Sequence, residues 1–514
     1  MFPEEGHPHR WAILLVLIVG EFVVELDTTI VTVALPDVAG EFAAGTSALQ
    51  WVVDAYILTF AGLLLLSGAL GDRWGYRRVL CMGLALFALG SLVAAVSPSI
   101  GVLIGSRAFM GIGAALILPT TLATLTRVFP AGERAKALSM WAATGGLSFV
   151  LGPVVGGALV DAFGWPAIFV VNLPIAAVAV AGILRYVPAG SVGAGTAPDV
   201  TGAALSIAGL GTLVFAIVEA PRHGWTSTGT LVELALAALC LAAFVAWEIR
   251  AKAPMLDMGL FRSRSFSATA IAAVLTFLAV GGVLFVLTLE LQEVHGHSAL
   301  GAGVRLLPVA LMLVVFSPAS VVLEQRVGAK VTVGLGLGLI AVGLGLLAPL
   351  EARESYTNIA IALGIAGAGY GLTLTPLIDT MTAAASLSRV GATFGVANAI
   401  IVVGFSLGVA IIGSIVSTRY GHLIGPSQRG LPGDAADAIR GSVGQALGVA
   451  RELHSAPLAA AARDAFSHGA ARGFGTAAAI AAAGAAVVTV FLPARPYREA
   501  RVQPDAAPAA AESR

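Results

Sequence analysis

The sequence predicts an all-α protein that crosses a membrane many times. Hydrophobic residues make up 58% of the 514 positions and charged residues only 11%, and the mean hydropathy is +0.92. Soluble domains carry about 25% charged residues, so most of this chain is expected to face lipid. The 29 basic and 29 acidic residues balance to a net charge of zero, which indicates no nucleic-acid partner.

Fourteen stretches are apolar over the roughly 20 residues that a membrane-spanning helix needs. They are predicted at 11–35, 50–70, 79–97, 100–127, 137–160, 166–187, 200–220, 230–249, 267–291, 300–322, 331–350, 357–381, 390–417 and 473–493. The first is too long for the apolar part of a cleaved signal peptide and contains three acids, so we expect it to stay as a membrane anchor.

The distribution of basic residues orients these helices. If the N-terminus is cytoplasmic, nineteen of the 29 Lys and Arg residues fall on the cytoplasmic side, and only Arg222 and Arg353 fall in short external loops. Such a bias follows the positive-inside rule. We therefore expect a multi-pass protein of the bacterial cytoplasmic membrane, with both termini in the cytoplasm.

The chain divides into two long helical parts, a linker and small polar segments. Residues 418–472 carry apolar residues at helical spacing and are predicted to form short external helices, either as a cap over a transport path or as a plain tether. The expected parts are a cytoplasmic N-terminus (1–10), a six-helix bundle (11–187), a linker with two extra helices (188–266), a second six-helix bundle that includes the external segment (267–493) and a disordered cytoplasmic tail (494–514).

A weak internal repeat relates the two bundles. "LGDRWGYR" (Leu70–Arg77) follows the second span, and "LEQRVGAK" (Leu323–Lys330) follows the tenth. Both have the pattern L-x-x-R-x-G-x-(R/K), and both fall in predicted cytoplasmic loops. Because internal repeats are typical of membrane transporters, this match predicts a duplicated core.

Four motifs in order resemble those of the major facilitator superfamily. "GALGDRWGYRRVL" (Gly68–Leu80) is similar to its cytoplasmic loop motif, and "LIGSRAFMGIGAA" (Leu103–Ala115) to its fourth-helix motif. "SFVLGPVVGG" (Ser148–Gly157) resembles the fifth-helix motif of antiporters, and "LDTTIVTVALP" (Leu26–Pro36) the first-helix motif of the fourteen-helix drug:proton antiporter branch. The chain departs from the usual residues at Tyr76, Met110 and Ser148.

This resemblance implies a fold, an activity and a site. The implied fold is the major facilitator fold, with fourteen helices arranged as 6+2+6 and two pseudo-symmetric halves. The implied activity is export of a small amphipathic molecule in exchange for protons, with the proton gradient as energy source and without a cofactor. It also implies a role for Arg107 in proton coupling.

The loop motif is expected to brace one conformation. Asp72 can form charge-assisted bonds between helix ends with the arginines that flank it, which are Arg73, Arg77 and Arg78. Gly68 and Gly75 are expected to permit a tight backbone path. The alternative is that these arginines serve only as topology anchors.

The fifth-helix motif places small residues around a proline. Gly152, Gly156 and Gly157 allow neighbouring helices to approach closely, and Pro153 favours a kink. We expect this helix to bend or slide between states; generic close packing is the alternative.

Few ionisable residues lie within the predicted spans. A cation such as Arg107 costs at least about 2.5–3.5 kcal/mol at the membrane centre, so it needs a partner or a water-filled cavity. A salt bridge that locks helices together is the alternative to proton coupling. Asp54 and Asp379 are further coupling candidates, whereas Glu290 and Arg305 are expected to reach out to the external interface and Glu248 to be solvated.

The first span carries three acids on two faces. At about 100° per residue, Glu21 and Glu25 share a stripe with Thr28 and Thr32, a face suited to lining an aqueous cavity. Asp27 lies roughly 160° from Glu25 by the same geometry and is expected to face a helix contact or a second polar partner.

The glutamate pair suggests how transport could be coupled to protons. Two ionised glutamates at i and i+4 repel each other and low dielectric disfavours either charge, so the pair is expected to hold one proton. A cationic substrate would expel that proton, and a proton would expel the substrate. We favour Glu25 for the substrate charge and keep Asp27 as a coupling or conformational site.

Other functions are weighed against this one. A dedicated exporter of an endogenous metabolite or lipid differs only in substrate, and a proton-coupled importer is disfavoured by the antiporter-like motif. The sequence has no HExxH, no GxSxG with partners and no phosphate-binding loop, which disfavours an enzyme. Cys81 and Cys240 have no metal-site or redox spacing, so no metal is expected. We expect a monomer in the lipid bilayer.

Overall fold

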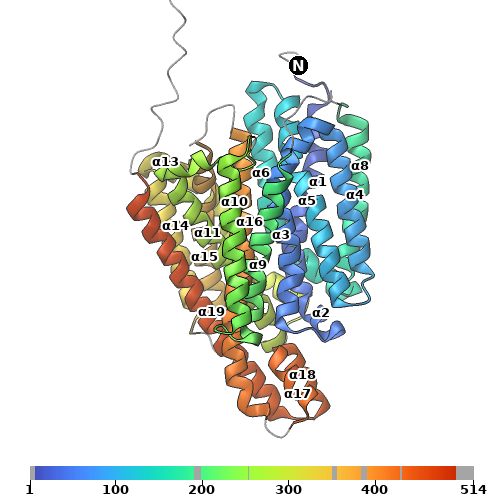
Figure 1. Ribbon diagram of the computed structural model, residues 1–514, viewed down its shortest axis with the longest axis vertical. Helices are drawn as coiled ribbons and strands as arrows, with labels where there is room; N and C mark the ends of the chain where they lie inside the picture. Colours follow the sequence, from blue (N-terminus) through green and yellow to red (C-terminus); the bar gives the residue numbers. More distant parts are fainter. Residues whose placement is uncertain are drawn as a thin grey trace, which may run out of the picture.

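The protein is built from helices packed side by side. The computed structural model describes residues 6–189, 198–252, 254–349, 356–383, 390–428 and 431–493. Every regular element in these ranges is helical, which confirms the all-α prediction. Most of the helices run along the long axis of the molecule, and the N-terminus lies at one end of the bundle (Figure 1). The predicted tail at 494–514 lies outside the described residues, as do residues 1–5 of the predicted N-terminal segment.

The N-terminal half begins with a long helix that changes its winding. Its helices are α1 (Arg10–Ile30), η1 (Val31–Ala34), α2 (Leu35–Phe42), α3 (Thr46–Trp74), α4 (Tyr76–Ala95), α5 (Ile100–Val128), α6 (Ala131–Phe163), α7 (Ala167–Val170) and α8 (Asn172–Tyr186). The short η1 is a 3₁₀ turn within the predicted first span, so that span is not one regular α-helix.

The C-terminal half has the same order of long helices. Two helices precede it, α9 (Val200–His223) and α10 (Thr228–Arg250). The remaining elements are η2 (Met258–Arg262), α11 (Arg264–Leu289), η3 (Glu290–Val294), α12 (Ala299–Arg305), α13 (Leu307–Val327), α14 (Ala329–Leu347), α15 (Tyr356–Ala383), α16 (Val390–Ile424), η5 (Gly425–Gln428), α17 (Gly433–Gly441), α18 (Val443–Glu452) and α19 (Ala456–Phe491).

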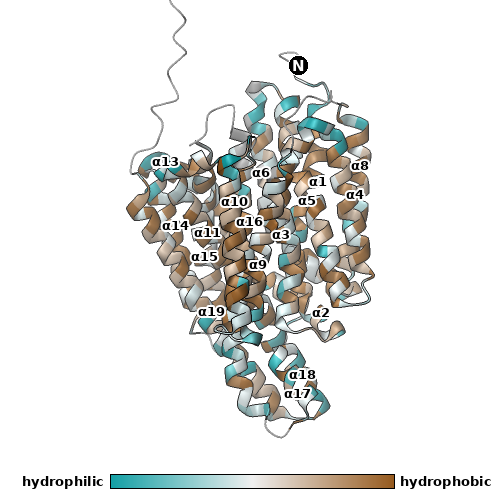
Figure 2. Cartoon of the chain, in the orientation of Figure 1, coloured by the Kyte–Doolittle hydropathy of each residue, from teal (hydrophilic) through white to brown (hydrophobic). Residues whose placement is uncertain are grey.

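Helix length and composition support a membrane location. Twelve helices among the described residues are long and apolar enough to cross a bilayer. Helices α1 and α6 lie outside that set: α1 carries three acids, and the apolar part of α6 is the shorter stretch Leu151–Phe163. Hydrophobic residues cover the middle of the bundle, whereas hydrophilic ones gather at its ends and on α17 and α18 (Figure 2).

The helices of the two halves pack in corresponding pairs. In the first half α5 packs on α3 and α4, α1 on α6, and α8 on both α1 and α4. In the second half α15 packs on α13 and α14, α11 on α16, and α19 on both α11 and α14. Each pair in one half therefore has a counterpart at the same place in the other half. This is the packing that a duplicated six-helix unit would produce.

The repeated loops also share a backbone conformation. Gly75 and Gly328 occupy the same position of the L-x-x-R-x-G-x-(R/K) pattern, and their φ angles are +87° and +85°. Each glycine ends one helix and begins the next. Because residues with a Cβ rarely adopt this conformation, the repeated glycine has a clear physical reason.

The two halves meet along two seams. On one side α3 packs against α16, and on the other α6 packs against α12 and α13. Helix α9 covers the first seam, because it contacts both α3 and α16, and α10 packs mainly on α9. Helices α9 and α10 thus lie beside the contact between α3 and α16.

The predicted external segment is a helical hairpin that projects beyond the bundle. Helices α17 and α18 lie at the end of the molecule opposite the N-terminus (Figure 1). Tyr420 of α16 donates a hydrogen bond to the carbonyl of Ile439 (2.9 Å), and Thr46 at the start of α3 donates one to Gly441 (3.3 Å). Helix α19 begins at Ala456, seventeen residues before the predicted last span, and carries the chain back into the bundle.

Candidate functional site

Asp27 and Arg107 form a buried ion pair inside the N-terminal half. Both side chains have no solvent exposure, and Arg107 Nη1 of α5 donates a hydrogen bond to Asp27 Oδ2 of α1. Arg107 Nε also donates to the carbonyl of Val52 in α3 (3.1 Å). A buried charge is tolerated when it is paired and hydrogen-bonded, so each of these two residues allows the other to be buried in its charged form.

Polar and aromatic groups complete the surroundings of this pair. Asn172 Nδ2, at the start of α8, lies 3.1 Å from both Asp27 Oδ1 and Ser91 Oγ of α4. The guanidinium of Arg107 lies 4.3 Å from the ring centroid of Tyr56, a cation–π contact. The network therefore joins five helices of one half, α1, α3, α4, α5 and α8.

Among the residues that the structure describes, no cation pairs with either glutamate of α1. Glu21 is buried, and its Oε2 atom has no hydrogen-bond partner among the described residues. Glu25 is half-buried and interacts electrostatically with Glu21, with Tyr56 and, across the junction of the halves, with Tyr370 of α15. Helix α1 thus separates a compensated acid, Asp27, from two uncompensated ones.

Asp54 lies at the seam between α3 and α16. Its side chain is fully buried, and Ser406 of α16 donates a 2.7 Å hydrogen bond to Oδ1. The other oxygen, Oδ2, has no partner among the described residues. One turn away, Gln50 Nε2 donates to the carbonyls of Val409 (2.8 Å) and Ala410 (3.2 Å). Two polar side chains of the N-terminal half therefore bind the C-terminal half within the membrane region.

The structure does not bring Asp379 into this interior group. Asp379 is exposed, four residues before the end of α15, so it is displaced from the acids of α1 and α3.

Two expectations about solvated acids are wrong. Glu290 is buried and accepts a 2.6 Å hydrogen bond from Ser467, and Glu248 is buried and accepts one from the backbone N–H of Leu256 (3.0 Å).

The loop motif forms a latch with a partner from outside the motif. Asp72 accepts hydrogen bonds from Tyr76 and from Arg127 Nη2 (3.0 Å), which lies at the end of α5. The guanidinium of Arg127 also stacks 4.3 Å from the ring centroid of Tyr76. Tyr76, a departure from the motif, is therefore part of the latch.

The flanking residues of this loop behave differently from the expectation. Arg77 donates to the carbonyl of Leu184 in α8 (2.7 Å) rather than to Asp72. No ion pair joins Asp72 to Arg73, Arg77 or Arg78 among the described residues. Gly75 has the positive φ that a tight turn requires, but Gly68 lies inside α3, and a Cβ placed there would have open space around it.

The glycines of α6 lie where other helices come closest. A Cβ at Gly152 would lie 1.9 Å from Thr29 Oγ1 of α1, and one at Gly157 would lie 2.5 Å from the carbonyl oxygen of Ala299 in α12. Gly156 faces α1 as well. From the opposite side, a Cβ at Gly303 would lie 2.1 Å from the carbonyl oxygen of Pro153. This motif is therefore close-packed on two sides, against α1 within its own half and against α12 of the other half.

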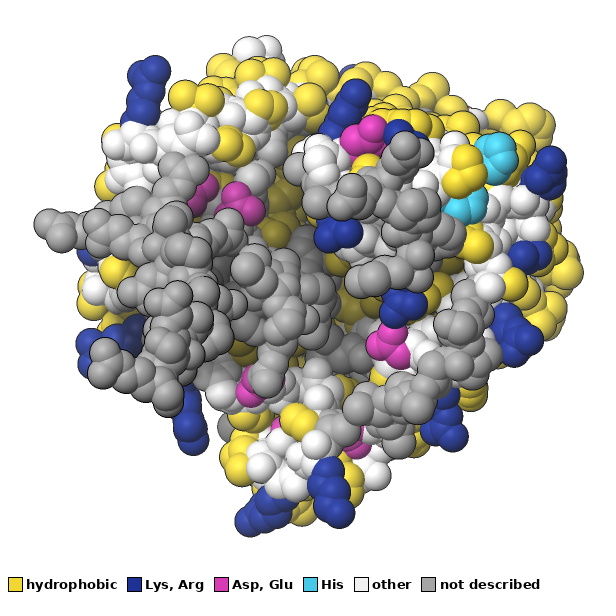
Figure 3. All heavy atoms as spheres, turned by 90° about the horizontal axis from the view of Figure 1, so that it is seen from above, with side chains coloured by type: hydrophobic (Ala, Val, Ile, Leu, Met, Phe, Trp, Pro, Cys, Tyr) yellow, Lys and Arg dark blue, Asp and Glu magenta, His cyan; other side chains and the backbone are white. Residues whose placement is uncertain are grey.

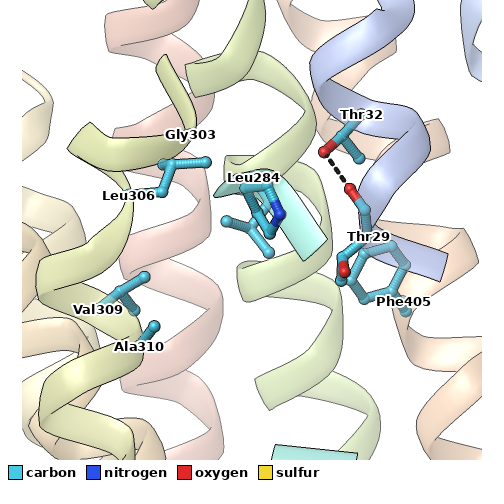
Figure 4. Close-up of a pocket in the computed structure, with 9 residues that line it drawn as sticks. Thr29, Thr32, Leu284, Gly303, Leu306, Val309, Ala310 and Phe405 are labelled. Atoms are coloured by element: carbon cyan, nitrogen blue, oxygen red, sulfur yellow. Dashed lines mark hydrogen bonds between the residues drawn. The ribbon is translucent and has the colours of Figure 1, made fainter. Parts of the chain in front are cut away.

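A narrow cavity lies beside this contact, between the halves. Its space for solvent is about 10 Å³, roughly one water molecule. Figure 4 shows Thr29 and Thr32 on one wall and apolar side chains on the others. The cavity is lined by Thr29, Thr32, Pro153, Leu284, Gly303, Leu306, Val309, Ala310 and Phe405.

The 3₁₀ turn changes which threonines face this cavity. Thr32 belongs to η1, where residues three apart eclipse each other, and its hydroxyl donates to the carbonyl of Thr29 (2.7 Å). The predicted polar stripe was based on 3.6 residues per turn, which grouped Thr32 with Thr28. Thr28 instead donates to the carbonyl of Val24 in its own helix (3.2 Å).

Several residues of the site were missed by sequence reasoning. Asn172 had a usable signal, since it is a lone amide in the apolar stretch "IFVVNLPIAAV". Ser406, Ser467 and Arg127 had none, because serines are common in membrane helices and Arg127 reads as a topology charge. Among the described residues no group of three or more His, Cys, Asp and Glu side chains could hold a metal ion.

Comparisons with known proteins identify relatives over most of the chain. Residues 17–409 match the family model described as Major Facilitator Superfamily. The multidrug resistance protein Stp of Mycobacterium tuberculosis is 38% identical over 80% of this chain and 77% of its own length. The tetracenomycin C resistance and export protein of Streptomyces glaucescens is 32% identical over 96% of this chain and 94% of its own length.

A solved structure has a similar fold. It is the bacterial homolog of the human lysosomal transporter Spinster, in an inward-facing and unoccupied conformation. The TM-score is 0.68, and the match covers 94% of this chain and 96% of the other at 17% identity.

Proposed function

Since the chain belongs to the Major Facilitator Superfamily, and is therefore a membrane transporter rather than an enzyme, we propose that it exports amphipathic drugs or antibiotics in exchange for protons. Two observations support the proposed cargo. The relatives named above are a multidrug resistance protein and an antibiotic resistance and export protein. The uncompensated Glu25 lies at the junction of the halves, where it can attract a cation.

The proposed topology has fourteen spans in a 6+2+6 layout. It adds α1 and α6 to the twelve apolar helices, treats α9 and α10 as the inserted pair, and places residues 11–187 and 267–493 in the two halves. Packing supports this layout, because α1 and α6 occupy the positions that α11 and α16 occupy in the other half.

Charge supports a cytoplasmic location for the N-terminal face. Lys and Arg side chains stand around the rim of that face, which Figure 3 views from above. The hairpin of α17 and α18 would then be external, above the bacterial cytoplasmic membrane.

Transport would proceed by alternating access between the halves. The hairpin side of the junction is closed by the contact of α6 with α12, which supports an assignment of this conformation as open toward the cytoplasm. Drug-sized ligands occupy pockets of roughly 300–1,000 Å³, far more than the cavity at Thr29 holds. The halves would therefore separate at this contact to release the substrate on the hairpin side.

Proton coupling would use Glu25, supported by Glu21. A cationic substrate and a proton would compete for this carboxylate, because no cation pairs with it in the described part of the chain. Asp27 is paired with the buried Arg107 in this conformation, so its proposed role is to position α1 rather than to exchange a proton. Asp54 is kept as a second coupling candidate. The transporter would work as a monomer and without a cofactor or metal, driven by the proton gradient alone.

The experiment is transport of a cationic dye such as ethidium into everted membrane vesicles. Accumulation should require a gradient that is acidic inside, and collapse of the gradient should abolish it. A Glu25→Gln variant should lose most of this accumulation, whereas Thr28→Val, one turn away on the same helix, should retain it. Dye uptake that is unchanged after collapse of the gradient would refute antiport.

One relative supports a second candidate, the export of a specific metabolite for self-resistance. The tetracenomycin C resistance and export protein matches over nearly the whole of both chains. A panel of unrelated drugs, tested on a pump-deficient bacterium that expresses this protein, separates the two. Resistance to many chemical classes supports multidrug export, and resistance to a single compound supports the dedicated exporter.

A further inference from the structure

A second uncompensated carboxylate lies in the C-terminal half. Glu290 begins η3, a π-helical turn at the end of α11, and only 7% of its surface is exposed. Ser467 of α19 donates a 2.6 Å hydrogen bond to its Oε1 atom. The Oε2 atom has no hydrogen-bond partner, and the carboxylate makes no ion pair with any described residue. π-helical turns often occur at functional sites.

Charged groups lie on the elements next to Glu290, but among the described residues none of them bonds to its carboxylate. On its own turn, Glu293 interacts electrostatically with Arg451 of α18 and Arg463 of α19. The ring Nδ1 of His295 lies 3.1 Å from the backbone carbonyl oxygen of Glu290. Other titratable or charged groups on this turn and on neighbouring elements are Asp37 of α2, His297 after η3, Arg305 of α12, and Asp464, His468 and Arg472 of α19.

The turn that carries Glu290 lies at the closed junction of the halves. Gln292 Nε2, two residues on, donates a 3.0 Å hydrogen bond to the carbonyl of Val33 in the N-terminal half. Nearby, Asp161 at the end of α6 accepts hydrogen bonds from the backbone N–H groups of Ala299 (3.1 Å) and Leu300 (3.2 Å). These bonds cross between the halves and must break when the two halves part. We call this set of contacts the external seam.

Glu290 is buried, and no cation pairs with it among the described residues. An ionised carboxylate that loses water costs several kcal/mol unless an opposite charge or several hydrogen bonds replace that water. Glu290 has one hydrogen bond, so the closed seam favours its neutral form. Opening of the seam lets water reach the turn, and hydration then favours the ionised form.

We propose that Glu290 is a proton-binding site that makes closure of the external seam dependent on external pH. The carboxylate takes up one proton from the external solution as the seam closes and returns it to the same solution as the seam opens. This proton is therefore distinct from the one that crosses the membrane. The inference rests on the proposed function, since it assumes that the halves alternate between two openings.

Asp37 would act in the same direction as Glu290. It lies in α2, outside the membrane-spanning helices, and desolvation together with repulsion by Asp161 raises its pKa above the ordinary value. A group with a raised pKa in the closed state favours that state as the pH falls. Acidic external solution, which supplies the protons for antiport, should thus promote closure.

The test measures the seam directly. Spin labels are attached to Val96→Cys in the N-terminal half and Leu453→Cys in the hairpin, both of which are exposed, in a background with Cys81 and Cys240 replaced by alanine. The distance distribution between the labels is recorded in lipid nanodiscs from pH 8 to pH 5. The ratio of closed to open molecules should rise at least tenfold as the pH falls. Glu290→Gln, which mimics the neutral acid, should favour the closed seam throughout, and the remaining change, which Asp37 would cause, should be less than twofold.

Matched variants separate Glu290 from its titrating neighbours. Glu293→Gln and His295→Gln should keep the tenfold response. Ser467→Ala removes the one hydrogen bond that stabilises the carboxylate, so its transition should move to higher pH. A Glu290→Gln seam that responds to pH like the wild-type seam would overturn the proposal. If Glu290→Gln does not fold, an unshifted transition in Ser467→Ala would overturn it.

Failure of the proposed function would look different. Wild-type protein that carries no dye in the vesicle assay but keeps a Glu290-dependent seam response would refute drug export and leave this inference standing. If the wild-type protein exports dye and the Glu290→Gln seam keeps the wild-type pH response, drug export stands and the role of Glu290 is refuted.

Discussion

In the interior of the N-terminal half a buried acid is paired with a cation, whereas the buried acids at or near the junction of the two halves are not paired among the described residues. Inside the half, Asp27 has Arg107 as a fully buried partner and Asn172 as a further donor. Asp54 at the junction, and Glu290 beside it in the C-terminal half, each have one serine hydroxyl and one oxygen without a partner among the described residues.

This difference separates a structural charge from a mobile one. A compensated carboxylate has little reason to gain or lose a proton as the helices move, because its partner moves with it. An uncompensated carboxylate at an interface changes its surroundings whenever that interface opens, so its proton follows the conformation. Glu25 belongs to the second class, although it lies only two residues from Asp27.

The largest expected effect comes from removal of the partner of Asp27. Arg107→Met leaves a buried carboxylate without a cation, which should cost about 3–5 kcal/mol of stability. Thermal unfolding of the purified protein in detergent should show a large fall in Tm, or the protein should fail to accumulate in the membrane. The double variant Asp27→Asn/Arg107→Met should recover part of that loss. A single Arg107→Met variant as stable as the wild type would show that the pair is not the compensated site described above.

The next largest effect is expected where the halves touch through glycine. In Gly303→Ala the new methyl group collides with the backbone of α6, and overpacking of this kind costs about 1–3 kcal/mol. The cost falls on the closed seam, so dye export should drop roughly five- to 150-fold while the protein still folds. Gly338→Ala in α14 is the matched control, because a Cβ there has open space. Equal activity of the two variants would contradict the assigned contact.

An intermediate effect is expected for Asp54→Asn. The amide can keep the hydrogen bond from Ser406 and carries no charge. The free energy of unfolding should therefore change by less than about 1 kcal/mol, and Tm should change little. The pH dependence of dye export should weaken, because one group that titrates at the junction is gone. Gln50→Leu, one turn away, should instead lower stability and leave the pH profile unchanged. An unchanged pH profile in Asp54→Asn would remove this residue from the coupling group.

The smallest effect is expected in the cytoplasmic latch. Asp72 and Arg127 are about half exposed, so Asp72→Asn should lower stability by only about 0.2–1 kcal/mol, and less at high salt. Chemical unfolding at two salt concentrations measures this difference. A loss as large as that of Arg107→Met would mean that exposure does not distinguish the two ion pairs.

The helices could be predicted from the sequence more easily than the contacts between them. The apolar spans and the glycine motifs are local patterns, so the all-helical fold, the repeat at Gly75 and the close approach of Gly157 could be predicted. Helical geometry also placed Asp27 and Glu25 on different faces of α1, because the angle between two positions only two residues apart is set by the local helix.

The partners of the buried acids could not be predicted in the same way. Ser406 meets Asp54 across 352 positions of sequence, and Ser467 meets Glu290 across 177. Such contacts depend on the rotation and register of long helices, which hydropathy does not fix. The 3₁₀ turn at Val31 is a further example, since it changes the face of Thr32 without a signal in composition.

The central claim is that the proton exchanged for substrate belongs to an uncompensated acid and not to the Asp27–Arg107 pair. The most direct test is proton release when ethidium binds to purified protein in weakly buffered detergent solution, followed with a pH-sensitive dye. Wild type and the double variant Asp27→Asn/Arg107→Met, which leaves no unpaired buried charge, should each release protons upon binding, whereas Glu25→Gln should release fewer protons or none. Undiminished release from Glu25→Gln, together with its loss in the double variant, would contradict the account and place the exchanged proton on the ion pair.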